Sequence, residues 1–125
     1  MATDIIRGWK LDRQQRTELL ARFPLRYGNP VADHVTFKPD DAAMPDIGEA
    51  RIVGRADDGS GVDAMVVAID GSTERPDGGA WHITWSLAHG RKARESNDVI
   101  AEHGWAALDG PMLILTPAEW ERTSG

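Results

Sequence analysis

Two short segments of this chain alternate apolar and polar residues with a period of two, the pattern of a β-strand with one buried face. They are VADHVTFK at 31–38 and WHITWSL at 81–87. Between them, residues 49–56 and 62–69 flank the sequence DDGSG, whose glycines suit a hairpin turn. We therefore predict strands in these four segments, followed by a last strand at 112–115.

Two other segments are typical of helices. LDRQQRTELLARF at 11–23 brings its leucines close to one face, with Asp12 available as N-cap and Pro24 as the stop. A second helix is predicted at 93–103, ended by Gly104. Because strands and helices are mixed without a regular strand-helix-strand order, the fold class predicted is α+β with mainly antiparallel pairing.

The size and composition narrow the class of protein further. A chain of 125 residues is expected to form a single domain over 1–125, with 118–125 as a loose tail. It has no cysteine, which excludes disulfides, thiolate metal sites and cysteine nucleophiles. The formal net charge of -6 argues against a protein that binds long nucleic acids through many phosphate contacts.

The sequence gives no sign of membrane insertion or export. No apolar run approaches the roughly 20 residues of a membrane span, and the first residues lack the basic and apolar regions of a signal peptide. We therefore expect a cytoplasmic protein with no membrane partner.

A short motif occurs twice, as His-Val-Thr-Phe at 34–37 and His-Ile-Thr-Trp at 82–85. In both copies, a period of two places His and Thr together on the face opposite the bulky apolar residues. Two imidazoles and two hydroxyls that meet in one cleft can process a phosphate: the hydroxyls donate to its oxygens, while one ring takes a proton and the other gives one. This chemistry needs neither a metal nor a cofactor.

The duplicated motif resembles that of the two-histidine (2H) phosphoesterases. The stretch 82–97 is also similar to the second-motif region of the cyclic phosphodiesterase domain of fungal and plant tRNA ligases and of the myelin cyclic nucleotide phosphodiesterase. The resemblance implies a compact bilobal fold with pseudo-twofold symmetry, in which His34 and His82 are the catalytic pair and Thr36 and Thr84 hold the phosphate.

Four further residues are candidates for substrate binding. Lys38 shares the predicted face of His34, and Lys92 follows the second motif, so that either lysine can neutralise phosphate charge. Ser86 continues the predicted face of His82, and Tyr27 can stack on a base. For each of the four, an ordinary surface or packing role remains open.

The leading hypothesis is a metal-independent phosphodiesterase that hydrolyses the 2′,3′-cyclic phosphate of a nucleotide or an RNA end to a 2′-phosphate. Cyclic oligonucleotides, 2′-5′ linkages or an ADP-ribose cyclic phosphate are alternative substrates for the same chemistry. A non-catalytic nucleotide-binding module is the alternative from another class. We expect a monomer that acts on small nucleotides or RNA termini, in functional association with an RNA kinase or ligase.

Overall fold

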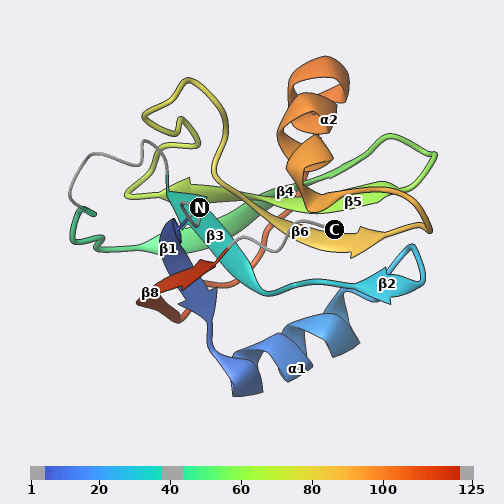
Figure 1. Ribbon diagram of the computed structural model, residues 1–125. Coiled ribbons are helices and arrows are strands. Elements are labelled where there is room, and N and C mark those ends of the chain that lie inside the picture. The colour runs from blue at the N-terminus through green and yellow to red at the C-terminus, as the bar shows by residue number, and fades with distance from the viewer. Residues whose placement is uncertain (1–4, 38–43, 122–125) are drawn as a thin grey trace.

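The computed structural model of this protein describes residues 5–37 and 44–121 (Figure 1). Its helices are α1 (Arg13–Arg22) and α2 (Ser96–His103), and α2 directly follows the short 3-10 helix η1 (Ala93–Glu95). Its strands are β1 (Ile5–Leu11), β2 (Asn29–Pro30), β3 (His34–Phe37), β4 (Ala50–Asp57), β5 (Val62–Ile69), β6 (His82–Leu87), β7 (Ala106–Ala107) and β8 (Leu115–Glu121).

The predicted α+β class is confirmed. The strands form a three-stranded sheet, β3-β1-β8, and a five-stranded sheet, β2-β6-β5-β4-β7, and all their pairings are antiparallel. The predicted hairpin is β4 and β5. The predicted N-cap of α1 is also present, because the Asp12 carboxylate accepts a hydrogen bond from the amide of Gln15 at 3.0 Å.

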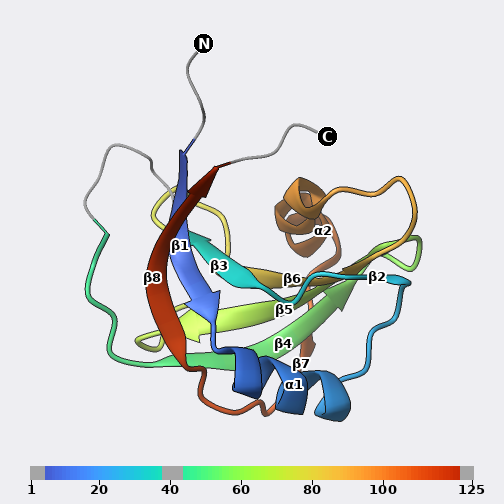
Figure 2. The same ribbon diagram turned by 60° about the horizontal axis from the view of Figure 1, so that its bottom comes forward.

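Two stretches of chain join the sheets to each other. After β2, the amide of Ala32 donates to the carbonyl oxygen of Thr84 in β6 at 2.8 Å, and the chain then enters β3. Before β8, the amide of Leu113 donates to the carbonyl oxygen of Ala50 in β4 at 2.7 Å. The two sheets therefore wrap around a shared interior; Figure 2 shows β8, β1 and β3 side by side, next to β6, β5 and β4.

The shared interior contains a cluster of aromatic rings. The ring of Trp9 in β1 lies 5.9 Å from that of Phe37 in β3 and 5.6 Å from that of Trp81, and both contacts are edge-to-face. Leu19 of α1 packs into the same core. Helix α2 covers the other face of the five-stranded sheet, where Ile100 packs in a smaller cluster, so the two helices lie on opposite sides of this sheet (Figure 1).

A β-bulge in the pairing of β5 with β6 changes which residues share a face. Thr84 lies opposite Ala64 and Ser86 lies opposite Asp63, so Trp85 is the extra residue between them. Neighbouring residues of β5 face opposite sides of the sheet, and their partners in β6 do the same. The prediction that Ser86 continues the face of His82 and Thr84 is therefore wrong.

The C-terminal strand also differs from the prediction. The sequence predicted a strand at 112–115 stopped by Pro117 and a loose tail from Ala118, whereas β8 runs from Leu115 to Glu121 and pairs with β1 along its length. Proline is tolerated here because β8 is an edge strand of its sheet. The partner strand β1 was itself not predicted, because Arg7 interrupts the apolar face of Trp9 and Leu11.

The two motif strands do not occupy equivalent positions in the fold. Strand β3 is at the edge of the three-stranded sheet, while β6 lies between β2 and β5. The main core draws residues from both sheets.

A buried charged pair lies on the core face of the five-stranded sheet. The carboxylate of Asp63 is fully buried and accepts two hydrogen bonds from the Arg55 guanidinium, each 2.8 Å long. The hydroxyl of Ser86 donates a third bond at 2.9 Å. A buried carboxylate is tolerated only with such partners, because the charge has lost its hydration.

We expect the substitution Arg55→Ala to lower the free energy of unfolding by about 3–5 kcal/mol, because it leaves the Asp63 charge buried without its counter-ion. Urea denaturation followed by tryptophan fluorescence measures this change. Arg26→Ala is the control: it removes an exposed guanidinium from Asp57 and should cost less than about 1 kcal/mol. Equal losses in the two variants would contradict the structural role of the buried pair.

Candidate active site

The structure brings the two motif histidines to neighbouring strand ends. Pairing of β2 with β6 sets Pro30 opposite Ser86, and the bond from the Ala32 amide to β6 continues this register. Strand β3 also packs against β6, and the charge of His34 acts on His82. Ala32 has a φ of 45°, and beyond this bend the chain turns to pair with β1.

Both histidines point away from the main core. In β3, Val35 and Phe37 are buried in that core, while His34 and Thr36 between them are half-buried. In β6, Ile83 is in the main core and His82 is half-buried on the opposite face. Each histidine therefore lies on the side of its own strand that the alternation predicts.

The His34 ring is held on two sides. Its Nδ1 atom lies 3.0 Å from a carboxylate oxygen of Asp33, and its ring centroid lies 4.5 Å from that of Trp120 in β8. The ammonium of Lys10, opposite His34 in β1, contacts the same Asp33 oxygen and lies 4.5 Å from the centroid of Trp120.

These neighbours set the charges around His34. Burial opposes ionisation of Asp33, but the Lys10 ammonium and the His34 ring lower the pKa of this carboxyl to about 2. Burial lowers the pKa of His34 below its ordinary value, while the hydrogen bond and negative charge of Asp33 oppose this effect. Asp33 is therefore ionised across the physiological range and favours the protonated ring.

The His82 ring is held by the backbone. Its Nδ1 atom lies 2.8 Å from the carbonyl oxygen of Ala80, which can only accept, so the ring carries its proton on Nδ1 when neutral. Burial lowers the pKa of His82 to about 4, the bond to Ala80 opposes this, and the positive charges of Arg75 and His34 lower it further. The effect of His34 on His82 places the two rings within electrostatic reach of each other.

The Nε2 atoms of both rings are available to a ligand. Neither atom has a hydrogen-bond partner among residues 5–37 and 44–121. Within the same residues, no buried side-chain nitrogen or oxygen lacks a partner, so both Nε2 atoms reach the surface. An imidazole with Nδ1 bonded and Nε2 accessible can accept or donate a proton at Nε2.

The two motif threonines have different surroundings. Thr36 is half-buried beside His34, on the face that it shares with Gly8 of β1. Thr84 is buried, and its hydroxyl lies 2.7 Å from that of Ser96 and 3.3 Å from the carbonyl oxygen of Ala93. The prediction that both threonines are displayed is therefore wrong for Thr84, because η1 and α2 cover it.

Two of the four predicted substrate-binding residues lie elsewhere. Ser86 is fully buried on the core side and donates to Asp63. The hydroxyl of Tyr27 donates to Asp57 at 2.6 Å, and its backbone amide donates to the Ser86 hydroxyl, which ties it to this network. The hydrogen bond to Asp57 raises the pKa of Tyr27. Neither side chain joins the histidines.

The two predicted lysines are placed differently. Lys38 lies outside the residues that the structure describes. Lys92 is exposed on the turn before η1, where its amide donates to Glu95 at 2.6 Å. This turn lies close to Thr84, so a role for Lys92 in binding remains a prediction.

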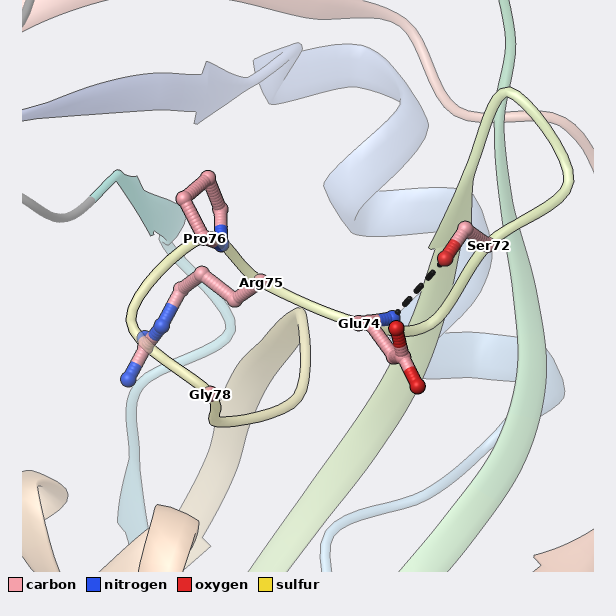
Figure 3. Close-up of a pocket in the computed structure, with 5 residues that line it drawn as sticks. All are labelled: Ser72, Glu74, Arg75, Pro76 and Gly78. Carbon is pink, nitrogen blue, oxygen red and sulfur yellow. Dashed lines mark hydrogen bonds between the residues drawn. The ribbon is translucent and has the colours of Figure 1, made fainter.

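The loop between β5 and β6 forms a hollow of about 500 Å³ beside the site, lined by Ser72, Glu74, Arg75, Pro76 and Gly78 (Figure 3). Arg75 is buried, and its guanidinium donates to both carboxylate oxygens of Asp77 at 2.8 and 3.0 Å. Its positive charge contributes to the low pKa of His82. None of the predicted site residues lines this hollow.

Sequence reasoning missed four residues near the histidines: Lys10, Asp33, Arg75 and Trp120. The sequence did contain one signal, the Asp-His dipeptide at 33–34, but period two assigned these residues to opposite faces. Trp120 fell in the predicted tail. Lys10 and Arg75 reach the site only through tertiary structure.

No family model, no curated protein and no solved structure matches this chain. Among the described residues, no group of three or more acidic or histidine side chains is arranged to hold a metal ion. In the same part of the chain, no helix is both long and apolar enough to span a bilayer. Function is therefore inferred from the geometry of the two histidines.

The low pKa of His82 makes the free energy of unfolding dependent on pH. The unfolded chain binds this proton near pH 6.5 and the folded chain only near pH 4, so stability falls as the pH drops through this window. We expect the free energy of unfolding to fall by about 3 kcal/mol less between pH 7 and pH 4 in His82→Gln than in the wild type. Urea denaturation at the two pH values measures this difference.

His89→Gln is the control for this experiment, because His89 is exposed in the loop after β6. It should keep the wild-type dependence on pH. If His82→Gln loses as much stability as the wild type between pH 7 and pH 4, the assignment to His82 is wrong.

Proposed function

We propose that this protein is a metal-independent phosphodiesterase that hydrolyses 2′,3′-cyclic phosphates of nucleotides or RNA ends. The observation that carries the proposal is that His34 and His82, on two strands that pack together, each have Nδ1 bonded and Nε2 at the surface. The duplicated motif and its resemblance to the two-histidine phosphoesterases give further support. In this chain the two motif strands belong to different sheets.

The reaction needs one proton acceptor and one proton donor on opposite sides of the phosphorus. One Nε2 atom takes a proton from water as the water oxygen bonds to phosphorus. The other Nε2 atom gives a proton to the 3′ oxygen as its bond to phosphorus breaks. The product is a 2′-phosphate, and solvent exchange restores the two rings.

The threonines contribute in two ways. Thr36, beside His34, donates its hydroxyl to a phosphate oxygen. Thr84 acts indirectly, because its hydroxyl holds Ala93 and Ser96 and so fixes the start of α2 against β6. The threonine pair of the motif is thus divided into one binding residue and one structural residue.

We expect hydrolysis of 2′,3′-cyclic mononucleotides in the presence of excess EDTA. His34→Ala and His82→Ala should each lower kcat by about 100- to 10,000-fold, since each removes an acid or base. Product formation is measured by chromatography and by phosphorus NMR, which distinguishes the 2′-phosphate from the 3′-phosphate. His103→Ala, on the exposed end of α2, is the control and should keep full activity.

Wild-type protein that is no more active than the two alanine variants would overturn the proposal. A panel with cyclic oligonucleotides, 2′-5′ linked dinucleotides and an ADP-ribose cyclic phosphate, measured by mass spectrometry, identifies the preferred substrate.

The two threonines give a second test. Thr36→Val should lower kcat/KM by about 10- to 100-fold through loss of a hydrogen bond to an anion, with almost unchanged stability. Thr84→Val should instead lower the free energy of unfolding by about 1–3 kcal/mol, because Ser96 loses its buried partner. Kinetics and urea denaturation of both variants measure this split, and the reverse pattern would contradict the division of roles.

A non-catalytic nucleotide-binding module is the second candidate, favoured by the burial of the Thr84 hydroxyl away from the surface. In that case, calorimetry shows stable binding of a 2′,3′-cyclic nucleotide, and the nucleotide is recovered unchanged after long incubation.

A further inference from the structure

The two histidines are held at Nδ1 by chemically different acceptors, a carboxylate for His34 and a backbone carbonyl for His82. We propose that Asp33 is a positioning residue that makes His34 the proton donor of the site and leaves His82 as the proton acceptor. This inference rests on the proposed function, and it assigns roles that the motif alone leaves open.

Asp33 is fixed on three sides at the point where the chain passes between the sheets. Its backbone carbonyl accepts from the amide of Leu11 at 2.9 Å and from the Arg13 guanidinium at 3.1 Å. Its carboxylate accepts from Arg13 at 3.0 Å, from Lys10 and from the His34 ring. The carboxylate therefore has a defined place against Nδ1 of His34.

The charges that face His34 come from three elements. Asp33, directly before β3, favours the imidazolium, and Lys10 of β1 and Arg13 of α1 oppose it. The Trp120 ring of β8 contacts the imidazole, and an aromatic face attracts a cation. Of these three charged groups, the Asp33 carboxylate is the one that is hydrogen-bonded to the ring and so also orients it.

His82 has the opposite character. Its ring is more deeply buried, its Nδ1 proton is bound by a neutral carbonyl, and Arg75 and His34 add positive charge, which Asp77 opposes. Its neutral form has an unprotonated Nε2, which is the form that accepts a proton. The charged acceptor on Nδ1 of His34 favours its protonated form more than the neutral carbonyl does for His82, which supports the assignment of donor and acceptor.

The cycle then has a fixed direction. Nε2 of His82 takes the proton of the attacking water, and the new bond from oxygen to phosphorus forms. The bond from phosphorus to the leaving oxygen breaks, and this oxygen takes the proton of Nε2 of His34. His34 ends neutral and His82 protonated, and exchange with solvent restores the starting state.

Asp33→Asn tests the charge separately from the shape, because the amide oxygen can still accept from Nδ1. We expect the pH at which His34 titrates, measured by NMR of its ring protons, to fall by about 1 unit or more. The descending limb of kcat/KM against pH should move to lower pH by the same amount. The ascending limb, set by His82, should move less.

Lys10→Met is the matched variant, and it should shift the titration of His34 in the opposite direction. It removes a positive charge that faces His34, so the ring should titrate at higher pH and the descending limb should move to higher pH. Asp98→Asn, exposed on α2, is the neutral control and should move neither limb.

The NMR titration separates failure of this inference from failure of the proposed function. If His82 titrates above His34, or if neither substitution moves the titration of His34, the inference is overturned even in an active enzyme. If His34 shifts as expected while no cyclic phosphate is hydrolysed, the order of protonation set by Asp33 is supported and the proposed phosphodiesterase activity is overturned.

Discussion

The stretch from Asn29 to Phe37 serves both sheets, and the position of the candidate site depends on its hydrogen bonds. Its first part pairs with β6 and its second part with β1, on either side of the bend at Ala32. The first pairing sets the register that brings His34 towards His82. The second pairing places Lys10 and Trp120 beside His34. A change in either pairing would separate groups that no local sequence signal holds together.

The two faces of the five-stranded sheet differ in how completely their polar side chains are hydrogen-bonded. On the core face, Asp63 is fully buried and satisfied by Arg55 and Ser86, which leaves no exposed atom for a ligand. On the opposite face, His82 keeps Nδ1 bonded and Nε2 at the surface, and His34 in the three-stranded sheet does the same. A buried polar group that is fully bonded supports the fold, and a half-bonded one at the surface is available for chemistry.

Alternation in the sequence was sufficient to predict the central part of the fold and the side of its strand on which each histidine lies. It predicted the β4–β5 hairpin, β6 and the outward direction of His34 and His82, because these depend only on a period of two and on turn chemistry. It failed at Ser86, because a single bulge residue moves this side chain to the other face of the sheet. It also failed at Thr84, because helix α2 covers this residue only in the folded structure. It also failed at β8, where Pro117 was interpreted as a stop, although an edge strand tolerates proline.

Two copies of one motif need not have equal roles, because the motif determines only which residues share a face. The acceptor at each Nδ1 comes from outside the pattern: a side chain at a bend between sheets for His34, and a loop carbonyl for His82. Burial lowers the pKa of both rings, and only the His34 ring has a carboxylate hydrogen-bonded to it to oppose this effect. In the proposed reaction this difference assigns the proton donor and the proton acceptor, because a ring bonded to a carboxylate is more readily protonated. The asymmetry of the fold around the two motif strands therefore distinguishes two rings that the motif alone leaves equivalent.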